Sequence, residues 1–240
     1  VAVCEKGRTR ATRLRHAMTE CCVLFWEIVV HSLRGDFDML RVRSEECIEI
    51  AHRENLGHWI SLVSVYSSLA KAFDGDPEVG LAQLDAATAD MQRVGYDTSK
   101  PYIMLNRSHI LALNGRDEEA LATIEQAISI ALKAQELVSF SELRRLRGEF
   151  LLEYRNDPVG AEREFRDALA FARTQNALSY ELRISTSLAN LMRRRGEAAR
   201  ALELLAPVYD RFAEGFGTAD LVAAKKTIDE LKLSIGAATS

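Results

Sequence analysis

The stretch "NLMRRRGEAARALELL", Asn190 to Leu205, decides the fold, because a helix-like segment that ends in arginines passes through a glycine into a second helix-like segment. The same arrangement occurs four more times. Its turn signals are "RGDFD" at Gly35, "DGDPE" at Gly75, "NGRDE" at Gly115, "RNDPV" at Asn156 and "RGEAA" at Gly196. The spacings of 40, 40, 41 and 40 residues indicate an internal repeat.

The segment after each turn carries one stripe of similar residues. Positions 5, 9, 12 and 16 after the turn advance by steps of four, three and four, which keeps them on one face of a helix. These residues are Leu40, Gly80, Ala120, Ala161 and Ala201; Ser44, Leu84, Ile124, Phe165 and Leu205; Cys47, Ala87, Ala127, Ala168 and Val208; and Ala51, Met91, Ala131, Ala172 and Phe212. Because most of them are small, we expect a neighbouring helix to approach closely there.

The turns also carry helix-boundary signals. Asp76-Pro77 and Asp157-Pro158 predict an N-cap acid followed by a proline in the first helical turn, where proline loses no hydrogen bond. The turn glycines predict a left-handed residue at the end of the preceding helix, a conformation that Asn156 can also adopt. Pro207 is expected to kink the helix that holds it.

These signals predict stacked helical hairpins. We expect first helices near 17–34, 57–73, 101–114, 138–154 and 178–195, and second helices near 37–54, 77–94, 117–135, 158–175 and 197–214, with a last helix at 218–235. A single hairpin cannot bury its apolar face, whereas stacked hairpins can. The predicted fold class is therefore all-α: a right-handed α-solenoid, or superhelix, of about five helix-turn-helix repeats of ~40 residues plus a C-terminal capping helix.

We expect one repeat domain over residues 16–240, with units at about 16–55, 56–96, 97–136, 137–176 and 177–216 and a cap at 217–235. Residues 1–15 are rich in basic side chains: Lys6, Arg8, Arg10, Arg13 and Arg15. We interpret this segment as a basic N-terminal remnant of a preceding repeat or a partial helix, with a basic binding arm as the alternative. The first residue is Val1, so a fragment of a longer chain, or a processed chain, is expected.

Composition excludes several classes of protein. Apolar residues make up 48% of the 240 residues and charged residues 28%, which argues against disorder. The formal charge of −4 provides no global field for nucleic acid or for an anionic membrane. The longest apolar run, "CCVLFWEIVV", is interrupted by Glu27 and is too short to span a membrane. With no signal-peptide pattern, a cytoplasmic location is expected. Cys4, Cys21, Cys22 and Cys47 lack paired spacing and are interpreted as buried thiols.

The stripe of small, bulky and small residues resembles the tetratricopeptide repeat (TPR). Gly148 resembles the small residue that this family places in the first helix, and Ser68 and Ser108 stand at the matching places of earlier units. The 40-residue unit is longer than the family's 34, and the usual aromatic residue of the first helix is mostly missing. The chain is therefore similar to the longer, divergent repeats of large bacterial signalling ATPases.

Residues 55–235, and most specifically "LLAPVYDRFAEGFGTADL" from Leu204 to Leu221, resemble the C-terminal repeat region of one bacterial family. Its members join an adenylate/guanylate cyclase domain, or a winged-helix DNA-binding domain, to a P-loop ATPase and then to such an array. This resemblance implies that the nucleotide chemistry belongs to domains other than this one.

No residue pattern for catalysis occurs in the chain. It contains neither a phosphate-binding loop nor a Gly-x-Ser-x-Gly motif. The five histidines, His16, His31, His52, His58 and His109, show no metal-ligand spacing. We therefore expect no enzyme activity, no catalytic residue, no metal and no cofactor in this chain, although its parent protein could be a cyclase or an ATPase. The arginine clusters "LRRLRGE" and "LMRRRGE" are interpreted as solvated, salt-bridged faces, with phosphate or acidic-peptide binding as the alternative.

The candidate binding site is the concave groove that first helices line in such arrays. Positions i, i+3 and i+7 of each first helix select Tyr66 with Leu69, then Tyr102, Leu105 or Asn106, and His109, then Glu142, Arg145 and Glu149, then Arg183, Thr186 and Asn190. The groove residues proposed on this basis are Tyr66, Tyr102, Asn106, His109, Arg145, Glu149, Arg183 and Asn190. The alternative is that Tyr66, Tyr102 and His109 pack between helices. Trp59 is expected in the core.

We therefore predict a non-catalytic protein-interaction or sensor module of a larger bacterial signal-transduction regulator. Its expected partners are a protein or peptide, or neighbouring domains of the same chain, and neither nucleic acid nor a membrane. Two alternatives stay open: a superhelix that binds a small-molecule inducer, and an oligomerisation module, which would include a homodimer.

Overall fold

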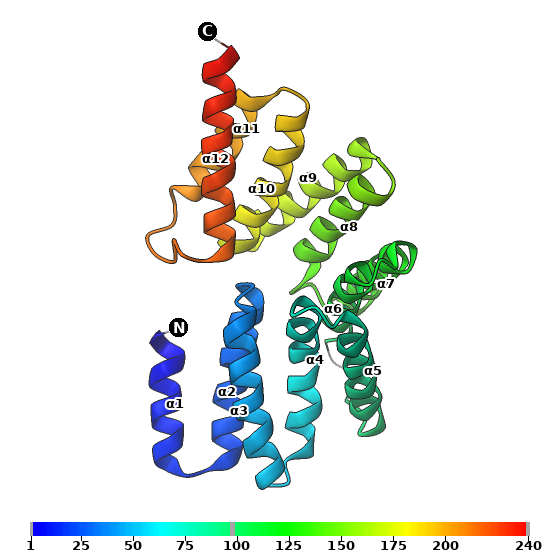
Figure 1. Cartoon of the computed structure of the whole chain (residues 1–240), viewed down its shortest axis with the longest axis vertical. Helices are drawn as coiled ribbons and strands as arrows, with labels where there is room; N and C mark the ends of the chain where they lie inside the picture. The colour runs from blue at the N-terminus through cyan, green and yellow to red at the C-terminus, as the bar shows by residue number, and fades with distance from the viewer. Residues whose placement is uncertain (1, 97–98, 239–240) are drawn as a thin grey trace. The chain divides into compact units, whose positions relative to one another are not determined.

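The computed structural model describes residues 2–96 and 99–238. Over these residues the chain forms twelve α-helices and no strand (Figure 1). Three parts of the predictions fall outside the described residues: position 1 of the N-terminal segment, positions 97–98 of the third unit, and positions 239–240 at the end of the repeat domain. The all-helical architecture predicted from the repeat period is confirmed.

The helices fall into two compact units, residues 1–123 (unit 1) and 124–240 (unit 2). Unit 1 contains α1 (Ala2–Leu14), α2 (Ala17–Leu33), α3 (Phe37–Arg53), α4 (Gly57–Phe73), α5 (Pro77–Arg93) and α6 (Lys100–Leu113). The boundary between the units falls within α7 (Asp117–Ala134). Unit 2 contains α8 (Phe140–Tyr154), α9 (Pro158–Thr174), α10 (Leu178–Arg194), α11 (Ala198–Tyr209) and α12 (Ala219–Ala238).

Helix boundaries follow the prediction closely, with one exception. All five first helices begin and end within two residues of the predicted positions, and so do the first four second helices. The prediction of a helix to residue 214 is wrong, because α11 ends at Tyr209. Pro207 lacks the N–H that would continue the hydrogen-bond ladder. Beyond Tyr209 the chain closes short turns instead, with the N–H of Phe212 donating to the Tyr209 carbonyl over 3.1 Å.

Left-handed residues end the helices, as the turn signals predicted. The backbone φ angle is 65° at Gly35, 102° at Gly75, 68° at Gly115, 47° at Asn156 and 79° at Gly196. The six-residue hydrogen bond of a Schellman motif accompanies the four glycines; the N–H of Glu197, for example, donates to the Met192 carbonyl over 3.0 Å. At Asn156 the bond spans one residue more, from the Asp157 N–H to the Leu151 carbonyl. The second helices end in the same way at Asn55, Gly95, Gln135 and Asn176, although only one of these four is a glycine.

The predicted N-cap interactions are confirmed at one of the two Asp-Pro turns. The Asp157 carboxylate accepts a hydrogen bond from the Gly160 N–H over 2.8 Å. Asp76 occupies the N-cap position of α5, but its side chain makes no capping hydrogen bond. Its carboxylate lies 3.9 Å from the Lys71 ammonium group instead.

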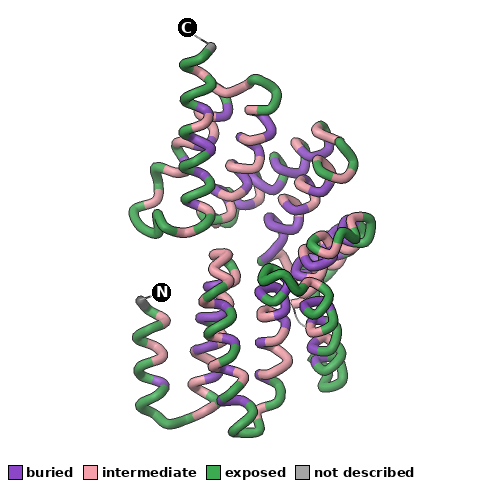
Figure 2. The backbone as a smooth tube through the Cα atoms, viewed as in Figure 1, coloured by how far each residue is buried: buried purple, intermediate pink, exposed green. Residues whose placement is uncertain are grey.

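The stripe that follows each turn forms the core between helices. All of its residues are buried except Phe212, which is half-buried. Close helix approach depends on the small members. A Cβ added to Gly80 would lie 2.6 Å from the Ser68 carbonyl oxygen, and one added to Gly148 would lie 2.6 Å from the Phe165 ring. Figure 2 shows the buried residues as bands along the sides where helices meet. Trp59 is buried as expected.

Helices contact their near neighbours in the chain. Within unit 1, consecutive helices pack together, and the first helices α2, α4 and α6 also contact one another in that order. Unit 2 repeats this arrangement, with α8, α10 and α12 in contact in that order. The helix predicted as a cap, α12, therefore takes the place of a sixth first helix.

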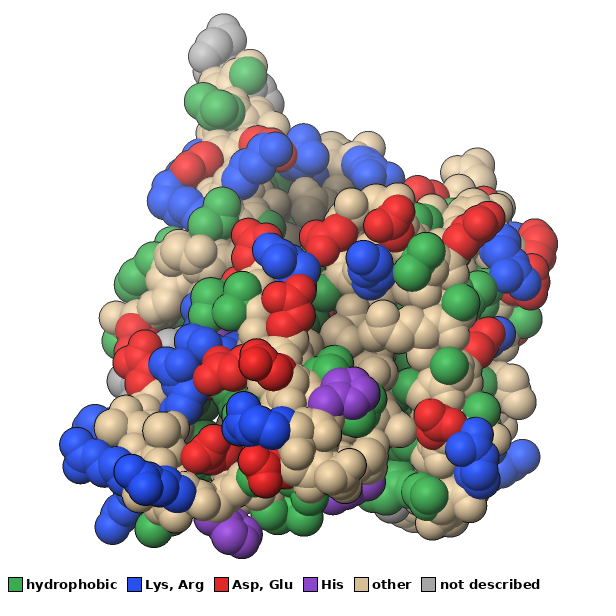
Figure 3. Space-filling model, turned by 60° about the horizontal axis from the view of Figure 1, so that its bottom comes forward, with side chains coloured by type: hydrophobic (Ala, Val, Ile, Leu, Met, Phe, Trp, Pro, Cys, Tyr) green, Lys and Arg blue, Asp and Glu red, His purple; other side chains and the backbone are tan. Residues whose placement is uncertain are grey.

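The N-terminal segment is a helix that has the features of a second helix. Cys4, Gly7 and Ala11 of α1 stand 40 residues before Ser44, Cys47 and Ala51, so α1 carries the same stripe. Ala11 is buried, and α1 packs on α2. Its exposed basic residues belong to the Lys and Arg side chains at the lower left of Figure 3, the side on which α1 lies in Figure 1. This packing supports the interpretation of residues 1–15 as the remnant of a repeat.

Candidate functional site

Neither a metal centre nor a membrane span is found in the part of the chain that the structure describes. No group of three or more His, Cys, Asp or Glu side chains in residues 2–96 and 99–238 is placed to hold a metal ion. No helix within these ranges is both long and apolar enough to cross a bilayer. The surfaces formed by the first helices, where the sequence placed the candidate residues, are therefore considered unit by unit.

The first helices of unit 1 carry a row of aromatic rings. The Tyr66 and Tyr102 ring centroids are 5.0 Å apart. Phe25 meets the Tyr66 ring edge-on at 5.5 Å, and Trp26 lies 5.7 Å from Phe25. We call Phe25, Trp26, Tyr66 and Tyr102 the aromatic row. It runs from α2 across α4 to α6.

A hydrogen bond and further ring contacts fix Tyr102 and Phe25 of the aromatic row. The Tyr102 hydroxyl and the Ser32 hydroxyl share a hydrogen bond of 2.8 Å. Phe25 also packs on Trp59 at 5.6 Å, and the Trp59 indole N–H points to the Met18 sulfur at 3.0 Å. Tyr66 and Tyr102 are half-buried, whereas 60% of Trp26 is exposed. The row thus combines inter-helix packing with accessible aromatic surface.

Asn106 and His109 differ in position although both lie on α6. Asn106 is buried, and its amide donates to the Val65 carbonyl on α4 over 3.2 Å. It therefore joins α6 to α4 and does not face a groove, and Leu69 and Leu105 are buried as well. His109 is half-buried.

An ion-pair network joins the first helices of unit 2. Arg145 makes two hydrogen bonds of 2.9 Å to the Glu142 carboxylate and one of 3.1 Å to Glu149. Arg183, on α10, lies 3.2 Å from the same Glu142 and donates to Asp220 on α12 over 3.0 Å and 2.6 Å. We call these five residues the ion-pair network. It brings together Arg145, Glu149 and Arg183, three of the residues that the sequence proposed for the groove, and it adds Asp220.

Burial and charge act in opposite directions on the two arginines of this network. Burial is the largest single effect and disfavours the charged guanidinium, but the charge and hydrogen bonds of Glu142 together with the charge of Glu149 outweigh it and raise the pKa of Arg145. The pKa of Arg183 is raised in the same way, by Glu142 and Asp220. Both arginines therefore stay charged, and their charges hold α8, α10 and α12 together.

A pocket of about 390 Å³ lies beside this network. It is formed by α8, α10 and α12, and its lining includes Asn190 and Thr186, which the sequence placed in the groove. The lining residues are Glu149, Leu152, Thr186, Ser187, Asn190, Leu191, Arg193, Arg194, Ala223, Lys226, Thr227 and Glu230. The Ser187 hydroxyl hydrogen-bonds Glu149, and the Thr227 hydroxyl lies 3.5 Å from the Asn190 amide oxygen.

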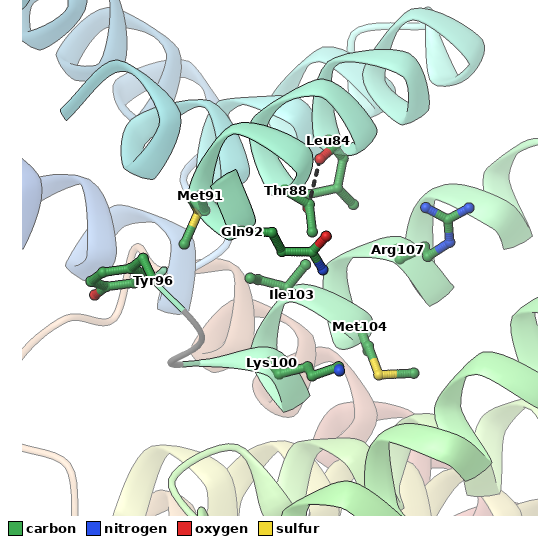
Figure 4. A pocket seen from close by; sticks show the side chains of 9 residues that line it. All are labelled: Leu84, Thr88, Met91, Gln92, Tyr96, Lys100, Ile103, Met104 and Arg107. Carbon is green, nitrogen blue, oxygen red and sulfur yellow. Dashed lines mark hydrogen bonds between the residues drawn. The ribbon is translucent and has the colours of Figure 1, made fainter. Parts of the chain in front are cut away.

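Two further hollows lie in unit 1. One, of about 110 Å³, lies between α5 and α6 and is lined largely by apolar side chains, including Met91, Ile103 and Met104 (Figure 4). The other, of about 340 Å³, lies between the beginning of α4 and the end of α5. Neither contains a residue of the predicted groove.

The first arginine cluster is salt-bridged, as predicted, but it is not a solvated face, because the side chains of Arg144, Arg145 and Arg147 are only 23%, 13% and 26% exposed. Glu164 is buried, and its carboxylate accepts hydrogen bonds from Arg144 over 2.9 Å and from Arg147 over 2.6 Å. In the second cluster Arg193 pairs with Glu230 at 3.2 Å and Arg195 pairs with Glu162. Arg194 is exposed and has no ion-pair partner within the described residues.

The buried-thiol prediction is correct for two of the four cysteines. Cys21 and Cys47 are fully buried and adjacent, and burial raises the pKa of both thiols. Cys4 and Cys22 are only half-buried. Cys4 and Cys47 both lie on the second-helix stripe. Among the described residues, however, α1 packs against a helix on one side only, which leaves Cys4 partly exposed.

Several residues of these surfaces were missed by the sequence reasoning. Asp220, Lys226 and Thr227 were overlooked because α12 was treated as a cap and not as a first helix. The available signal was the spacing, since α12 begins about 40 residues after α10. Phe25 and Trp26 were overlooked because no groove positions were assigned to the helix at 17–34.

Comparisons with known proteins identify the fold. No protein-family model and no curated protein matches this chain. A crystal structure described as a Podosopora anserina putative kinesin light chain with nearly identical TPR-like repeats is similar to it, with a TM-score of 0.55 and 15% identity over 72% of this chain and 85% of that one. A crystal structure of a substituted form of that same protein has a TM-score of 0.51 and 15% identity, over 78% and 92% of the two chains. At this identity the likeness shows the fold alone: an α-solenoid of TPR-like repeats.

Proposed function

We propose that this chain is a non-catalytic, TPR-like protein-interaction and sensor module of a larger cytoplasmic regulator in bacterial signal transduction. TPR-like folds generally mediate protein interaction, which supports the first part. The regulator is proposed to be a cyclase or a transcriptional regulator with a P-loop ATPase domain. The resemblance of residues 204–221 to the repeat regions of such proteins supports this part. No catalytic residue and no cofactor are assigned to the chain.

The aromatic row of unit 1 carries the proposal. Aromatic side chains provide a large apolar contact area at a low cost in conformational entropy, which favours them in binding surfaces. In this row Trp26 is 60% exposed, while Tyr66 and Tyr102 keep part of their surface accessible. A peptide that lies along the row therefore buries ring surface from α2, α4 and α6.

The proposed sensing mechanism follows from these three helices. A peptide on the row contacts side chains from different repeats, so its affinity depends on how far apart the helices lie. A ligand shifts a conformational equilibrium when it binds one arrangement better than another. Peptide binding would thus favour one spacing of α2, α4 and α6, and this change could be passed to neighbouring domains.

Peptide selection against the purified chain tests the proposal. Binders from a random peptide library are expected to lose at least about tenfold in affinity on Trp26→Ala, because an exposed aromatic anchor contributes about 1.4 kcal/mol or more. Phe216→Ala is the matched control, because Phe216 is 49% exposed but lies in unit 2. A library that yields no binder sensitive to Trp26→Ala, or binders weakened equally by Phe216→Ala, would contradict the assignment of the aromatic row.

A further inference from the structure

The pocket of unit 2 carries an excess of positive charge. Its charged lining residues are Arg193, Arg194, Lys226, Glu149 and Glu230, three cations against two carboxylates. Glu149 is engaged by Arg145 at 3.1 Å, and Glu230 is engaged by Arg193 at 3.2 Å. Both carboxylates are therefore already paired.

Two cations of the pocket have no counter-charge among residues 2–96 and 99–238. Arg194 and Lys226 are exposed, and neither has an ion-pair partner within the described residues. The Nε atom of Arg193 is buried and has no hydrogen-bond partner over the same residues. A buried donor without a partner costs free energy that a ligand acceptor would recover. These three donors come from α10 and α12 and line one pocket.

Neutral polar groups complete the lining. The Asn190 amide oxygen faces the Thr227 hydroxyl at 3.5 Å, and the two N–H bonds of this amide have no partner within the described residues. The Thr186 and Ser187 hydroxyls are held by the Leu182 carbonyl and by Glu149. Hydroxyls can both donate and accept, so this wall suits a ligand that carries hydroxyl or amino groups.

The size and surroundings of the pocket favour a small ligand over an extended peptide. Its volume of about 390 Å³ lies within the range of small-molecule sites. Beside it, Arg183 reaches from α10 to Glu142 on α8 and to Asp220 on α12. The ion-pair network thus occupies the neighbouring part of the first-helix surface, where an extended peptide would have to continue.

We propose that this pocket binds a compact organic anion, whose carboxylate or phosphate group is held by Arg193, Arg194 and Lys226 and whose hydroxyl or amino groups face Asn190 and Glu149. Guanidinium groups match both kinds of anion through paired hydrogen bonds. The two carboxylates in the lining disfavour a ligand of high negative charge, so one anionic group with neutral polar neighbours fits best. The site lies in unit 2 and is independent of the peptide site proposed on unit 1.

Calorimetric titration of the 240-residue chain tests the site. The probes are D-glycerate as a hydroxylated monocarboxylate and glycerol 3-phosphate as a hydroxylated phosphate, each with sodium chloride at equal ionic strength as the reference. At least one probe is expected to bind, and the double variant Arg194→Gln/Lys226→Gln is expected to weaken that binding at least about tenfold, since two charge-assisted contacts are lost. Both residues are exposed, and circular dichroism verifies that the variant stays folded.

The matched control is the double variant Arg13→Gln/Lys232→Gln, which removes the same charge from exposed positions outside the pocket. It should bind within about twofold of the wild type, since screened charges at a distance contribute little. Binding of glycerate alone identifies a carboxylate ligand, and binding of glycerol 3-phosphate alone identifies a phosphate ligand; both support the proposal. The proposal is overturned by equal losses in the two variants, by no heat beyond that of chloride, or by binding of an acidic octapeptide without either small anion.

Discussion

Gly148 illustrates how one residue without a side chain permits a helix contact. It lies in the middle of α8, where glycine weakens a helix through its backbone freedom. The buried Phe165 ring of α9 occupies the space next to it, and an added Cβ would come within 2.6 Å of that ring. The close contact of the two helices therefore depends on the absence of a side chain at this position.

The variant Gly148→Ala should be destabilised although alanine is the better helix former. Overpacking a tight core costs about 1–3 kcal/mol, which exceeds the helix-propensity gain of roughly 1 kcal/mol. Urea denaturation followed by circular dichroism measures the difference. Gly57→Ala is the control, because nothing lies within 4 Å of a Cβ added there, and it should be neutral or slightly stabilising. A Gly148→Ala variant as stable as Gly57→Ala would show that the Phe165 ring can move aside.

Ion pairs join the first helices of unit 2, whereas aromatic ring contacts join those of unit 1. Glu142 of α8 lies at the centre, because its carboxylate meets both Arg145 of the same helix and Arg183 of α10. Arg183 continues the chain of contacts to Asp220 on α12. Glu142 is only 5% exposed, so water has little access to replace the hydrogen bonds that its carboxylate accepts from the arginines.

Removing the Glu142 charge should therefore weaken the packing of three helices. We expect Glu142→Gln to lower the free energy of unfolding by about 3 kcal/mol, because two guanidinium groups that are only 13% and 19% exposed lose their shared counter-charge. Urea denaturation measures the loss. For comparison, Asp229→Asn removes the partner of Lys225 in a pair whose members are each about half-exposed, and such pairs contribute about 1 kcal/mol or less. Equal effects from the two substitutions would argue against a structural role for the network.

Across the whole chain, contacts between helices within each unit are local. The helices of each unit touch partners one or two places away in the chain, so a defect in one repeat acts first on its neighbours. Leu40 on α3 and Leu205 on α11 are both fully buried stripe residues, one in each unit. They provide a matched pair with which to compare the units.

Hydrogen exchange should respond to these two defects in different places. Leu→Ala at a buried site costs about 2–5 kcal/mol. Leu40→Ala is expected to speed amide exchange in α2, α3 and α4 more than in α10 to α12, and Leu205→Ala is expected to do the reverse. Mass spectrometry of peptides from each helix reads out both variants. A uniform increase along the chain from either substitution would mean that the whole array unfolds as one cooperative unit.

The fold could be read from the sequence because its signals are local and repeated. A glycine or asparagine that closes a helix, and a stripe with steps of three and four, depend on residues within one hairpin. The prediction was wrong at the end of α11, where a proline and the residues after it compete with the helix. The candidate site was harder to predict, since the i, i+3, i+7 spacing on the first helices cannot separate Asn106, which bonds to the α4 backbone, from a residue that faces solvent.

The sequence by itself determined the repeat, the helix boundaries and the all-α class, because each follows from short-range periodicity and turn chemistry. Only the tertiary structure decided which polar residues meet. Glu142, Arg183 and Asp220 belong to three different helices, and they are up to 78 positions apart in the chain. Their partnership, and the position of the Arg194 and Lys226 cations in the pocket beside them, depend on how neighbouring helices are rotated against one another. That rotation is set by side-chain packing between repeats, which no local pattern within one hairpin records.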